Sequence, residues 1–280
     1  MANVTITTAA NYIPTYWSAL ILETLHKNLV GAPLLDRRFE KFARNGNTIN
    51  VPGLAEIAAR TLTNMTGTIT FDANTESNVA ISLNKLTYTA VKIDMATNVQ
   101  IDYPAMEYYT GEIGRSVAEK IDTDVWTILD DHTQTVGTDN IALTDANVLR
   151  ARQYLDDAKA PMNDRFMVVS PATLMDFFGI DRYVNSLYSG SVRNLDGAKG
   201  PGYIGPLYNF DVYEGTNLPA GSSGKKNFAW QREADALVME KEISVRFAEP
   251  HDELAVAAIA WAVYGTKAMR NTSGVEMDGK

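Results

Sequence analysis

The sequence predicts a mixed α+β protein whose strands and helices occupy separate stretches of the chain. Three observations support this class. Between Pro52 and Ile101, apolar residues alternate with polar ones, which is typical of half-buried strands. From Pro104 to His132, apolar residues recur every three or four positions, which indicates one long helix. Helical and strand patterns then alternate between residues 141 and 240, which implies a compact mixed region.

Composition narrows the possible classes of protein. The chain has 280 residues, 45% hydrophobic and 21% charged, which is typical of a globular protein with a sizeable core. It has no cysteine, which excludes disulfides and thiolate chemistry and fits a reducing cytoplasm. Its net charge of -9 argues against a broad basic surface for nucleic acid. The apolar run Leu254 to Tyr264 is shorter than the roughly 20 residues of a membrane helix, and no signal peptide is evident.

Residues 1–46 are interpreted as an N-terminal arm. Apolar residues at helical spacing behind Pro14 predict a helix from Pro14 to Leu29. The following stretch is basic, and a turn at residues 45–47 precedes a predicted strand, Thr48 to Val51. The candidate subunit contacts in this arm are Arg37, Arg38 and Arg44.

Residues 47–101 are predicted to form a long two-stranded excursion, the hairpin from Pro52 to Ile93. Its expected strand segments are Thr68 to Phe71, residues 79–83 and residues 87–93. An isolated hairpin is marginally stable in water, so it either gains stability from another chain or folds over its own core. The candidate contacts near its tip are Arg60, Asn64 and Phe71.

The long predicted helix is acidic. Residues 101–140 contain nine acidic and two basic residues, a net charge of -7. A basic arm and an acidic helix suggest electrostatic matching, within the subunit or between neighbours, although two unrelated solvated faces remain an alternative. Glu112 and Glu119 are the candidate contacts on this helix.

The second half of the chain alternates between helix and strand. The predicted elements are a helix from Thr144 to before Pro161, a strand Phe166 to Val169, a helix opened by Ser170-Pro171, a strand Phe210 to Tyr213, and late strands Ile243 to Phe247 and Leu254 to Tyr264. The late strands are expected to rejoin the early sheet. Residues 181–206 form a long predicted surface loop with Arg182 and Arg193 as candidate contacts.

No motif indicates catalysis, a metal or a cofactor. Residues 200–205 match G-x-G-x-x-G, but no strand precedes them and Pro206 stands where a phosphate-binding helix would begin. The three histidines, His26, His132 and His251, lack metal-ligand spacing. We therefore predict no catalytic, metal-binding or cofactor-binding residue. Carboxylates brought together by folding stay possible, which keeps open a carboxylate-dependent α/β enzyme.

The order of certain segments resembles a known family. These segments are Ile13-Pro14 through Leu29, Gly46 to Pro52, Leu83 to Asp102, Ala160-Pro161 with Arg165 to Pro171, Phe210 to Tyr213 with Asn217-Leu218-Pro219, and Tyr264-Gly265. They cover nearly the whole chain. Together they resemble the HK-ninety-seven-type fold of tailed-bacteriophage major capsid proteins.

This resemblance implies an arm (1–46), an extended loop (47–101), a peripheral domain with a spine helix (102–140), an axial domain (141–240), and strands returning to the peripheral domain (241–280). It implies that the extended loop lies over an adjacent subunit. It also implies pentamers and hexamers in an icosahedral shell that encloses double-stranded DNA without sequence-specific binding, with scaffolding, portal and decoration proteins as further partners. The expected location is the virion, after assembly in the host cytoplasm, with no membrane contact.

Some members of that family join a loop lysine to an asparagine of a neighbour beside a glutamate. Lys85, Asn271 and Glu276 are the residues that could form such a set, but no motif assigns them these roles, and we do not predict the cross-link. Two further alternatives are an encapsulin-like compartment, which encloses enzymes instead of a genome, and a tail or accessory virion protein.

Overall fold

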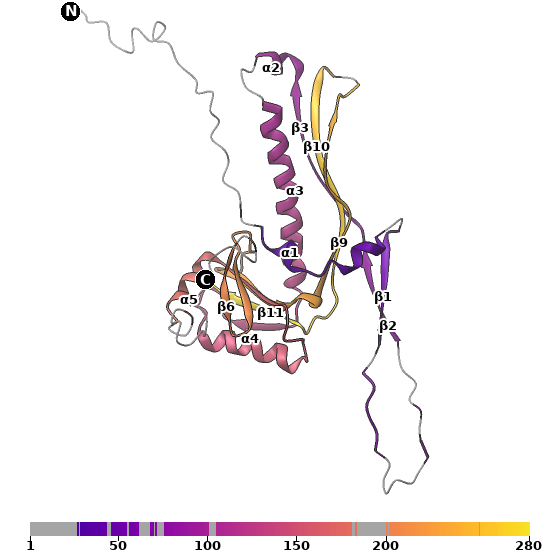
Figure 1. The fold of residues 1–280 in the computed structure, drawn as a ribbon. Coiled ribbons are helices and arrows are strands. Elements are labelled where there is room, and N and C mark those ends of the chain that lie inside the picture. Colours follow the sequence, from indigo (N-terminus) through magenta and orange to yellow (C-terminus); the bar gives the residue numbers. More distant parts are fainter. Residues whose placement is uncertain are drawn as a thin grey trace, which may run out of the picture.

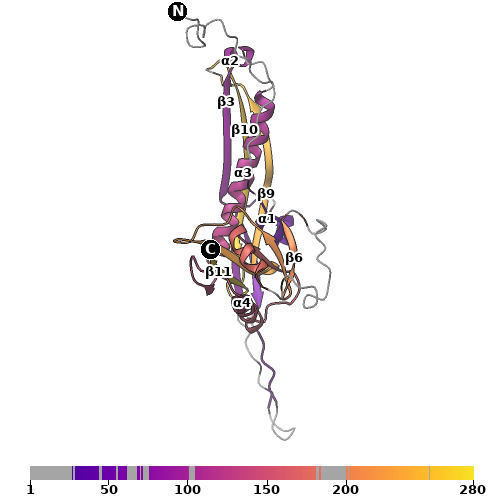
Figure 2. The same ribbon diagram turned by 90° about the vertical axis from the view of Figure 1, so that its left-hand side faces the viewer.

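The computed structural model describes residues 27, 29–43, 46–54, 56–61, 68–69, 71, 76–100, 105–180, 183, 200, 202–251 and 253–280. The predicted helix from Pro14 lies outside these residues, apart from Lys27 and Leu29 near its end. Figures 1 and 2 show an elongated subunit in which a long helix runs beside a long narrow sheet, with a broader mixed part at one end.

The long sheet has three antiparallel strands in the order β3-β10-β9. Their bounds are β3 (Lys85–Asp94), β9 (Asp235–Ala248) and β10 (Ala255–Ala268). Pairing of β3 with β10 confirms that the late strands rejoin an early one. Helix α2 (Met95–Gln100) follows β3 at the far end of this sheet (Figure 1).

Helix α3 (Ala105–Leu129) covers one face of the long sheet, which confirms the predicted long helix (Figures 1 and 2). Its residues Ile113, Val117 and Ile121 are buried one or two turns apart, as the apolar period requires. They belong to the same core as three alanines that β10 turns toward the helix, Ala258, Ala260 and Ala262. Because these side chains are small, the helix lies close against the strand.

A six-stranded sheet with the order β4-β11-β8-β5-β7-β6 forms the broader part. The strands are β4 (Gln134–Gly137), β5 (Arg165–Val169), β6 (Tyr203–Leu207), β7 (Phe210–Glu214), β8 (Lys225–Gln231) and β11 (Gly274–Gly279). Helices α4 (Asp145–Asp157) and α5 (Pro171–Phe178) share a core with one face of it. The predicted helices and strands β5 and β7 are confirmed here.

Local signals explain where the two shorter helices begin. Helix α5 is capped by Ser170, whose Oγ accepts the Thr173 N–H at 3.2 Å, and Pro171 occupies the first turn. Helix α4 follows Thr144, whose backbone is extended, and ends before Pro161. Side-chain capping and proline therefore set the start of α5, whereas Thr144 precedes α4 without a capping hydrogen bond from its side chain.

The opposite face of the six-stranded sheet packs on the last turns of α3. The indole of Trp126 stacks on Phe228 with ring centroids 5.7 Å apart and lies edge-on to Trp230 at 6.2 Å. Leu129 is completely buried in the same core. The long helix is therefore shared by both sheets and holds them together.

The hairpin is shorter than predicted. Strands β1 (Thr48–Leu54) and β2 (Glu76–Ser82) pair antiparallel from Thr48–Ser82 to Leu54–Glu76, and the hairpin projects from the body (Figure 1). The segment from Lys85 pairs with β10 and therefore belongs to the long sheet instead of the hairpin. Between the two strands, Leu83 packs into a small core with Ala236 and Val238. Described residues 68, 69 and 71 lie in no strand.

Two strands lie in a different sheet from the one that the expected division of the chain assigns to them. Strand β4 falls within residues 102–140 and β11 within residues 241–280, yet both lie in the six-stranded sheet, paired parallel to each other. Parallel pairing requires a long crossover, and here the chain between them includes nearly all of the axial region. Sequence position alone does not reveal such a pairing.

Candidate functional site

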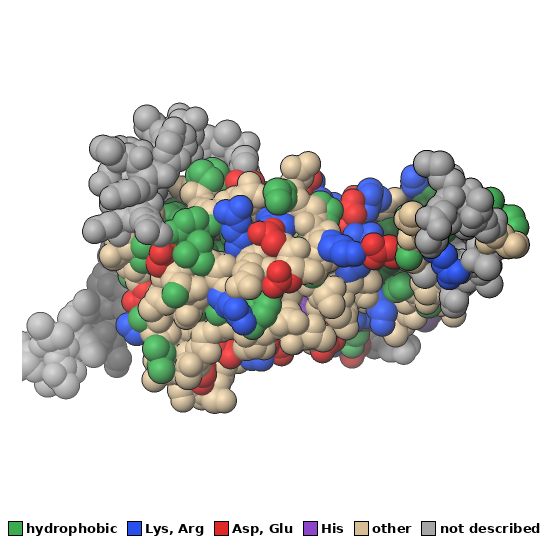
Figure 3. Space-filling model, turned by 90° about the horizontal axis from the view of Figure 1, so that it is seen from below, with side chains coloured by type: hydrophobic (Ala, Val, Ile, Leu, Met, Phe, Trp, Pro, Cys, Tyr) green, Lys and Arg blue, Asp and Glu red, His purple; other side chains and the backbone are tan. Residues whose placement is uncertain are grey.

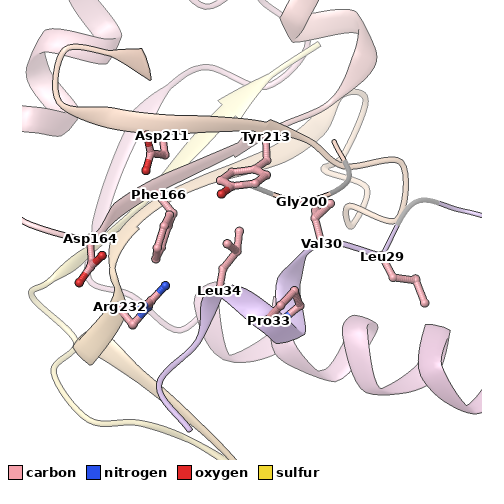
Figure 4. A pocket seen from close by; sticks show the side chains of 10 residues that line it. All are labelled: Leu29, Val30, Pro33, Leu34, Asp164, Phe166, Gly200, Asp211, Tyr213 and Arg232. Carbon is pink, nitrogen blue, oxygen red and sulfur yellow. The ribbon is translucent and has the colours of Figure 1, made fainter. Parts of the chain in front are cut away.

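One cavity of about 380 Å³ lies between the arm and the six-stranded sheet (Figure 4). Its walls combine apolar side chains, including Leu34, Phe166 and Tyr213, with Asp164, Asp211 and Arg232. The Arg232 guanidinium lies 5.0 Å from the centre of the Phe166 ring. The described residues that line it include no histidine, serine or threonine.

Metal sites and membrane-spanning helices are both absent from the described residues. Within those residues, no group of three or more His, Asp and Glu side chains could hold a metal ion. No helix in the described part of the chain is long and apolar enough to cross a membrane. The candidate functional features are two surfaces with exposed apolar side chains.

The first surface is the outer part of the hairpin. Ile57 is 71% exposed, Ile69 is 66% exposed and Phe71 is 92% exposed. Such exposure of large apolar side chains on a projecting segment is typical of a contact surface. Arg60, predicted as a contact, is exposed on the same segment, whereas Asn64 lies outside the described residues.

The second surface is the face of the long sheet opposite α3, which we call the outer sheet face. Leu86 and Tyr88 of β3 are 63% and 69% exposed. The strand register places them beside Val263 and Trp261 of β10. No helix covers this face along the upper part of the sheet in Figure 1.

Cations border the outer sheet face along β9. Lys241 and Arg246 lie across from Val263 and Ile259 in the strand register. The Lys241 ammonium lies 5.9 Å from the centre of the Trp261 ring. The face is thus apolar in the middle, with Lys241 and Arg246 along its β9 edge and the exposed acids Glu240 and Glu242 on the same strand.

The subunit covers the lower part of this same face with its own chain. Ile81 and Leu83 at the hairpin base are buried with Ala236 and Val238 of β9. Phe39 of the turn η2 (Arg38–Phe42) packs against this small core. The outer sheet face therefore continues a surface that already accepts hairpin residues within one subunit.

The arm is anchored to α3 by a buried carboxylate. Asp122, 1% exposed, accepts hydrogen bonds from the Gly31 N–H (2.8 Å), the Trp126 indole N–H (2.9 Å) and the Asn217 amide (3.2 Å). Burial raises the pKa of Asp122, and the hydrogen bonds from Asn217, Gly31 and Trp126 oppose that shift. A Cβ on Gly31 would lie 2.8 Å from the Asp122 oxygen, so helix α1 (Gly31–Leu34) begins with the residue that permits this approach.

The predicted arm arginines are paired within the subunit. Arg37 pairs with Glu40 at 2.6 Å and lies 4.0 Å from Glu242 of β9. Arg38 pairs with Asp36 at 2.7 Å and with Glu233 at 3.1 Å. Arg44 lies outside the described residues. The basic arm thus meets acids of its own segment and of the β9 region, whereas it meets acidic α3 through the backbone of Gly31.

Several acids of α3 are also matched within the subunit. Asp124 accepts from Tyr264 at 2.8 Å and pairs with Lys120 at 2.6 Å and Lys85 at 3.2 Å. Burial raises the pKa of Tyr264 to about 12, with the nearby Asp124 adding to the shift. Glu112 and Glu119, also on α3, are partly buried.

The three residues considered for a cross-link, Lys85, Asn271 and Glu276, contact different partners. Lys85 pairs with Asp124, and Glu276 pairs with Lys226 at 2.8 Å. The carbonyl oxygen of Asn271 is hydrogen-bonded to His132. Each of the three thus has a different partner within the subunit.

The remaining predicted contacts are in the axial region. Arg182 and Arg193 lie outside the described residues. Seen from below in Figure 3, acidic and basic side chains intermingle with apolar ones, and the described atoms in view form no single-sign patch. Exposed apolar side chains of the axial region include Met162 and Met175, at 64% and 60%.

These features define an elongated subunit with a projecting hairpin and an exposed sheet face. This is the HK-ninety-seven-type capsid architecture. A sequence model of the family described as phage capsid protein matches residues 87–275, and the chain belongs to this family. It is a structural virion protein, not an enzyme, and it assembles with copies of itself.

Solved structures agree with this fold. A structure from Mycobacterium phage Che8 is 23% identical, with a TM-score of 0.77, covering 95% of this chain and 97% of that one. The capsid of cyanophage P-SCSP1u is 12% identical, with a TM-score of 0.75, covering 98% and 94%. The mature capsid of bacteriophage PhiM1 is 13% identical, with a TM-score of 0.70, covering 96% and 92%. No curated protein sequence matches the chain.

Proposed function

We propose that this capsid protein forms the pentamers and hexamers of an icosahedral shell through the projecting hairpin of one subunit and the outer sheet face of the next. The shell is that of a tailed bacteriophage and encloses its double-stranded DNA. The observation that carries this mode of assembly is the pair of exposed apolar surfaces, one on the hairpin and one on the sheet, that a single subunit leaves in water.

The exposed apolar side chains of the hairpin favour association between subunits. Ile57, Ile69 and Phe71 are all more than half exposed. Burial of a large apolar side chain contributes roughly 1.5–3 kcal/mol, so covering these three favours association by several kcal/mol. A hairpin alone is marginal in water, and a neighbour that covers it also orders it.

The dimensions of the two surfaces are compatible. Twenty-one residues separate Leu54 from Glu76, so each arm beyond the paired base has about ten residues and a reach of roughly 33 Å. The outer sheet face from Ala257 to Val263 is six residue steps long, or roughly 20 Å. The tip of a neighbouring hairpin is thus long enough to cross it.

The other predicted contacts complete this proposal. Arg37, Arg38 and Arg44 on the arm, and Glu112 and Glu119 on α3, are proposed to lie near neighbouring subunits. Arg182 and Arg193 are proposed to approach the centre of each capsomer. We also propose assembly in the host cytoplasm with scaffolding, portal and decoration proteins, and DNA enclosed without sequence-specific binding.

The test is electron microscopy of particles made by the full chain, expressed with and without a candidate scaffolding protein. Deletion of residues 60–74 should leave a folded subunit that forms no closed shells. Phe71→Ser and Tyr88→Ser, on the two proposed surfaces, should each reduce the yield of shells at least tenfold. Met162→Ser changes an apolar residue elsewhere that is 64% exposed; it is the control and should assemble normally.

The outcomes separate the parts of the proposal. Normal shells from the deletion would refute a role for the hairpin in assembly. Normal shells from Tyr88→Ser, together with a defect in Phe71→Ser, would retain the hairpin and reject the outer sheet face as its receiving surface. Circular dichroism of each variant subunit shows whether an assembly defect is a folding defect.

A further inference from the structure

Three chain crossings connect the long sheet with the six-stranded sheet. The first follows α3 and leads into β4, the second passes from β8 through the turn η4 (Arg232–Ala234) into β9, and the third joins β10 to β11. His132 lies in the first crossing, Asp235 ends the second, and Asn271 lies in the third. The three residues meet at one point.

The histidine side chain links all three crossings. Its Nε2 lies 2.9 Å from Oδ2 of Asp235, and its Nδ1 lies 3.0 Å from the carbonyl oxygen of Asn271. Both side chains of the His132–Asp235 pair are fully buried. The ring lies directly against Gly274 of β11, where a Cβ would come within 2.3 Å of Nε2. Only a glycine at this position leaves room for the ring.

The hydrogen bonds fix how many protons the pair holds. A carbonyl oxygen only accepts, so Nδ1 of His132 carries a hydrogen and donates it to Asn271. The short contact between Nε2 and Asp235 then needs one further proton shared by the two groups. The pair is neutral with that proton, and without it an imidazole lone pair faces a carboxylate in a buried site. The other carboxylate oxygen, Asp235 Oδ1, is buried without a hydrogen-bond partner. The contact with His132 is therefore the main interaction that offsets the cost of burying this carboxylate.

The charges around the pair favour retention of the proton. Burial by itself would lower the pKa of His132, but the hydrogen bond and charge of Asp235 outweigh it and raise the pKa. The Asn271 carbonyl and Asp131, at the end of α3, act in the same direction. Gly274 of β11, which carries no charge, lies against the ring, and Arg270 in the third crossing lies 3.8 Å from Glu233.

We propose that the His132–Asp235 pair is a proton-dependent latch that fixes the long sheet relative to the six-stranded sheet. The latch is closed while the shared proton is present. Loss of that proton breaks the contact between the first two crossings and lets the two sheets move relative to each other. This device goes beyond shell formation and belongs to the single subunit.

The direction of the pH dependence follows from the raised pKa. A histidine whose pKa is higher in the folded state contributes stability that is complete below its unfolded value of about 6.5. That contribution is lost as the pH rises through the folded-state value. The latch is therefore closed in acid and at neutral pH and opens in alkaline solution.

Asp235→Asn gives a discriminating variant. An asparagine amide can donate to the lone pair of a neutral His132 Nε2, so the contact survives without the shared proton. If His132 were protonated, the N–H at its Nε2 would instead face the amide N–H of the asparagine, so two donors would meet without an acceptor. The variant latch should hold in alkaline solution and weaken below about pH 6.5, which is opposite to the wild-type protein. His251→Asn, which changes an exposed histidine, is the control and should follow the wild type.

The experiment measures urea unfolding of the full chain from pH 5 to pH 9.5, together with NMR titration of its 13C-labelled histidines. The expected result is a His132 titration above the value of about 6.5 of an ordinary histidine, and opposite pH slopes of stability for wild type and Asp235→Asn. Parallel slopes, or a His132 titration near 6.5, would overturn the proposal. Since the NMR titration uses the wild-type protein, the proposal stays testable if the variant does not fold.

Discussion

Replacement of Asp122 by alanine should detach the arm and destabilise the subunit. The substitution leaves the backbone N–H groups of Gly31 and Ala32 and the indole N–H of Trp126 without this acceptor. The Asn217 amide keeps the Glu119 carbonyl and the Thr123 hydroxyl, each at 3.3 Å. Each buried donor left unpaired costs roughly 1–3 kcal/mol. Removal of the carboxylate also removes the cost of burying it, which offsets several kcal/mol. We expect a net loss of about 3 kcal/mol in the free energy of unfolding.

The assay is urea unfolding of the unassembled subunit followed by tryptophan fluorescence, with limited proteolysis of residues 27–35 as a local readout. Asp122→Asn keeps one acceptor oxygen but turns an N–H toward the donors, so its loss should be intermediate. Asp157→Ala, on the exposed side of α4, is the matched control and should change stability by less than about 0.5 kcal/mol. A loss in Asp122→Ala no larger than this control, with an intact arm, would refute the reasoning.

Three further predictions concern α3, α5 and Tyr264. Gly111→Ala and Gly114→Ala should each stabilise the unassembled subunit by about 0.5–1 kcal/mol, because an added Cβ meets nothing within 4 Å; thermal unfolding measures this, and destabilisation would contradict it. Ser170→Ala should cost about 1 kcal/mol in urea unfolding through loss of the α5 cap, and an unchanged midpoint would count against that role. Because the pKa of Tyr264 is raised to about 12, its contribution should fall as the pH rises from about 10, where the unfolded phenol ionises; Tyr264→Phe should lack this part of the alkaline loss, and identical curves would show that it is absent.

Much of the fold could be predicted because its signals are local. The apolar period of α3, the cap at Ser170 and the apolar run in β10 all depend on residues a few positions apart, and each element formed where its pattern indicated. The resemblance to the HK-ninety-seven-type order of elements further predicted that late strands pair with early ones. That pairing is present between β10 and β3.

The missed features depend on partners far along the chain. The end of the hairpin was misjudged because β2 and β3 have the same alternating pattern, and only the pairing of Lys85 with Tyr264 shows that β3 has joined another sheet. Strand β11 carries a weak signal in the alternation of Val275 and Met277, which a closer reading of the last residues could have used. Its place beside β4 and β8 is set by tertiary packing.

The candidate contacts were harder to predict than the fold. A charged residue in a basic or acidic stretch gives no sign of whether its partner is in the same chain, and Arg37 and Arg38 have partners in their own subunit. The outer sheet face was not predicted, because Leu86 and Tyr88 fit a strand equally well with either face buried. The anchor at Asp122 was hidden among the other acids of α3.

The alanines of β10 have a consequence for the particle as a whole. Ala258, Ala260 and Ala262 bring the helix close to the sheet, so this part of the subunit is two thin layers extended over a long distance (Figure 2). A container made from thin, wide tiles encloses more space per gram of protein than one made from spherical subunits of equal mass. Larger side chains at these positions would thicken the tile, and a phage would then need more protein to package the same length of genome.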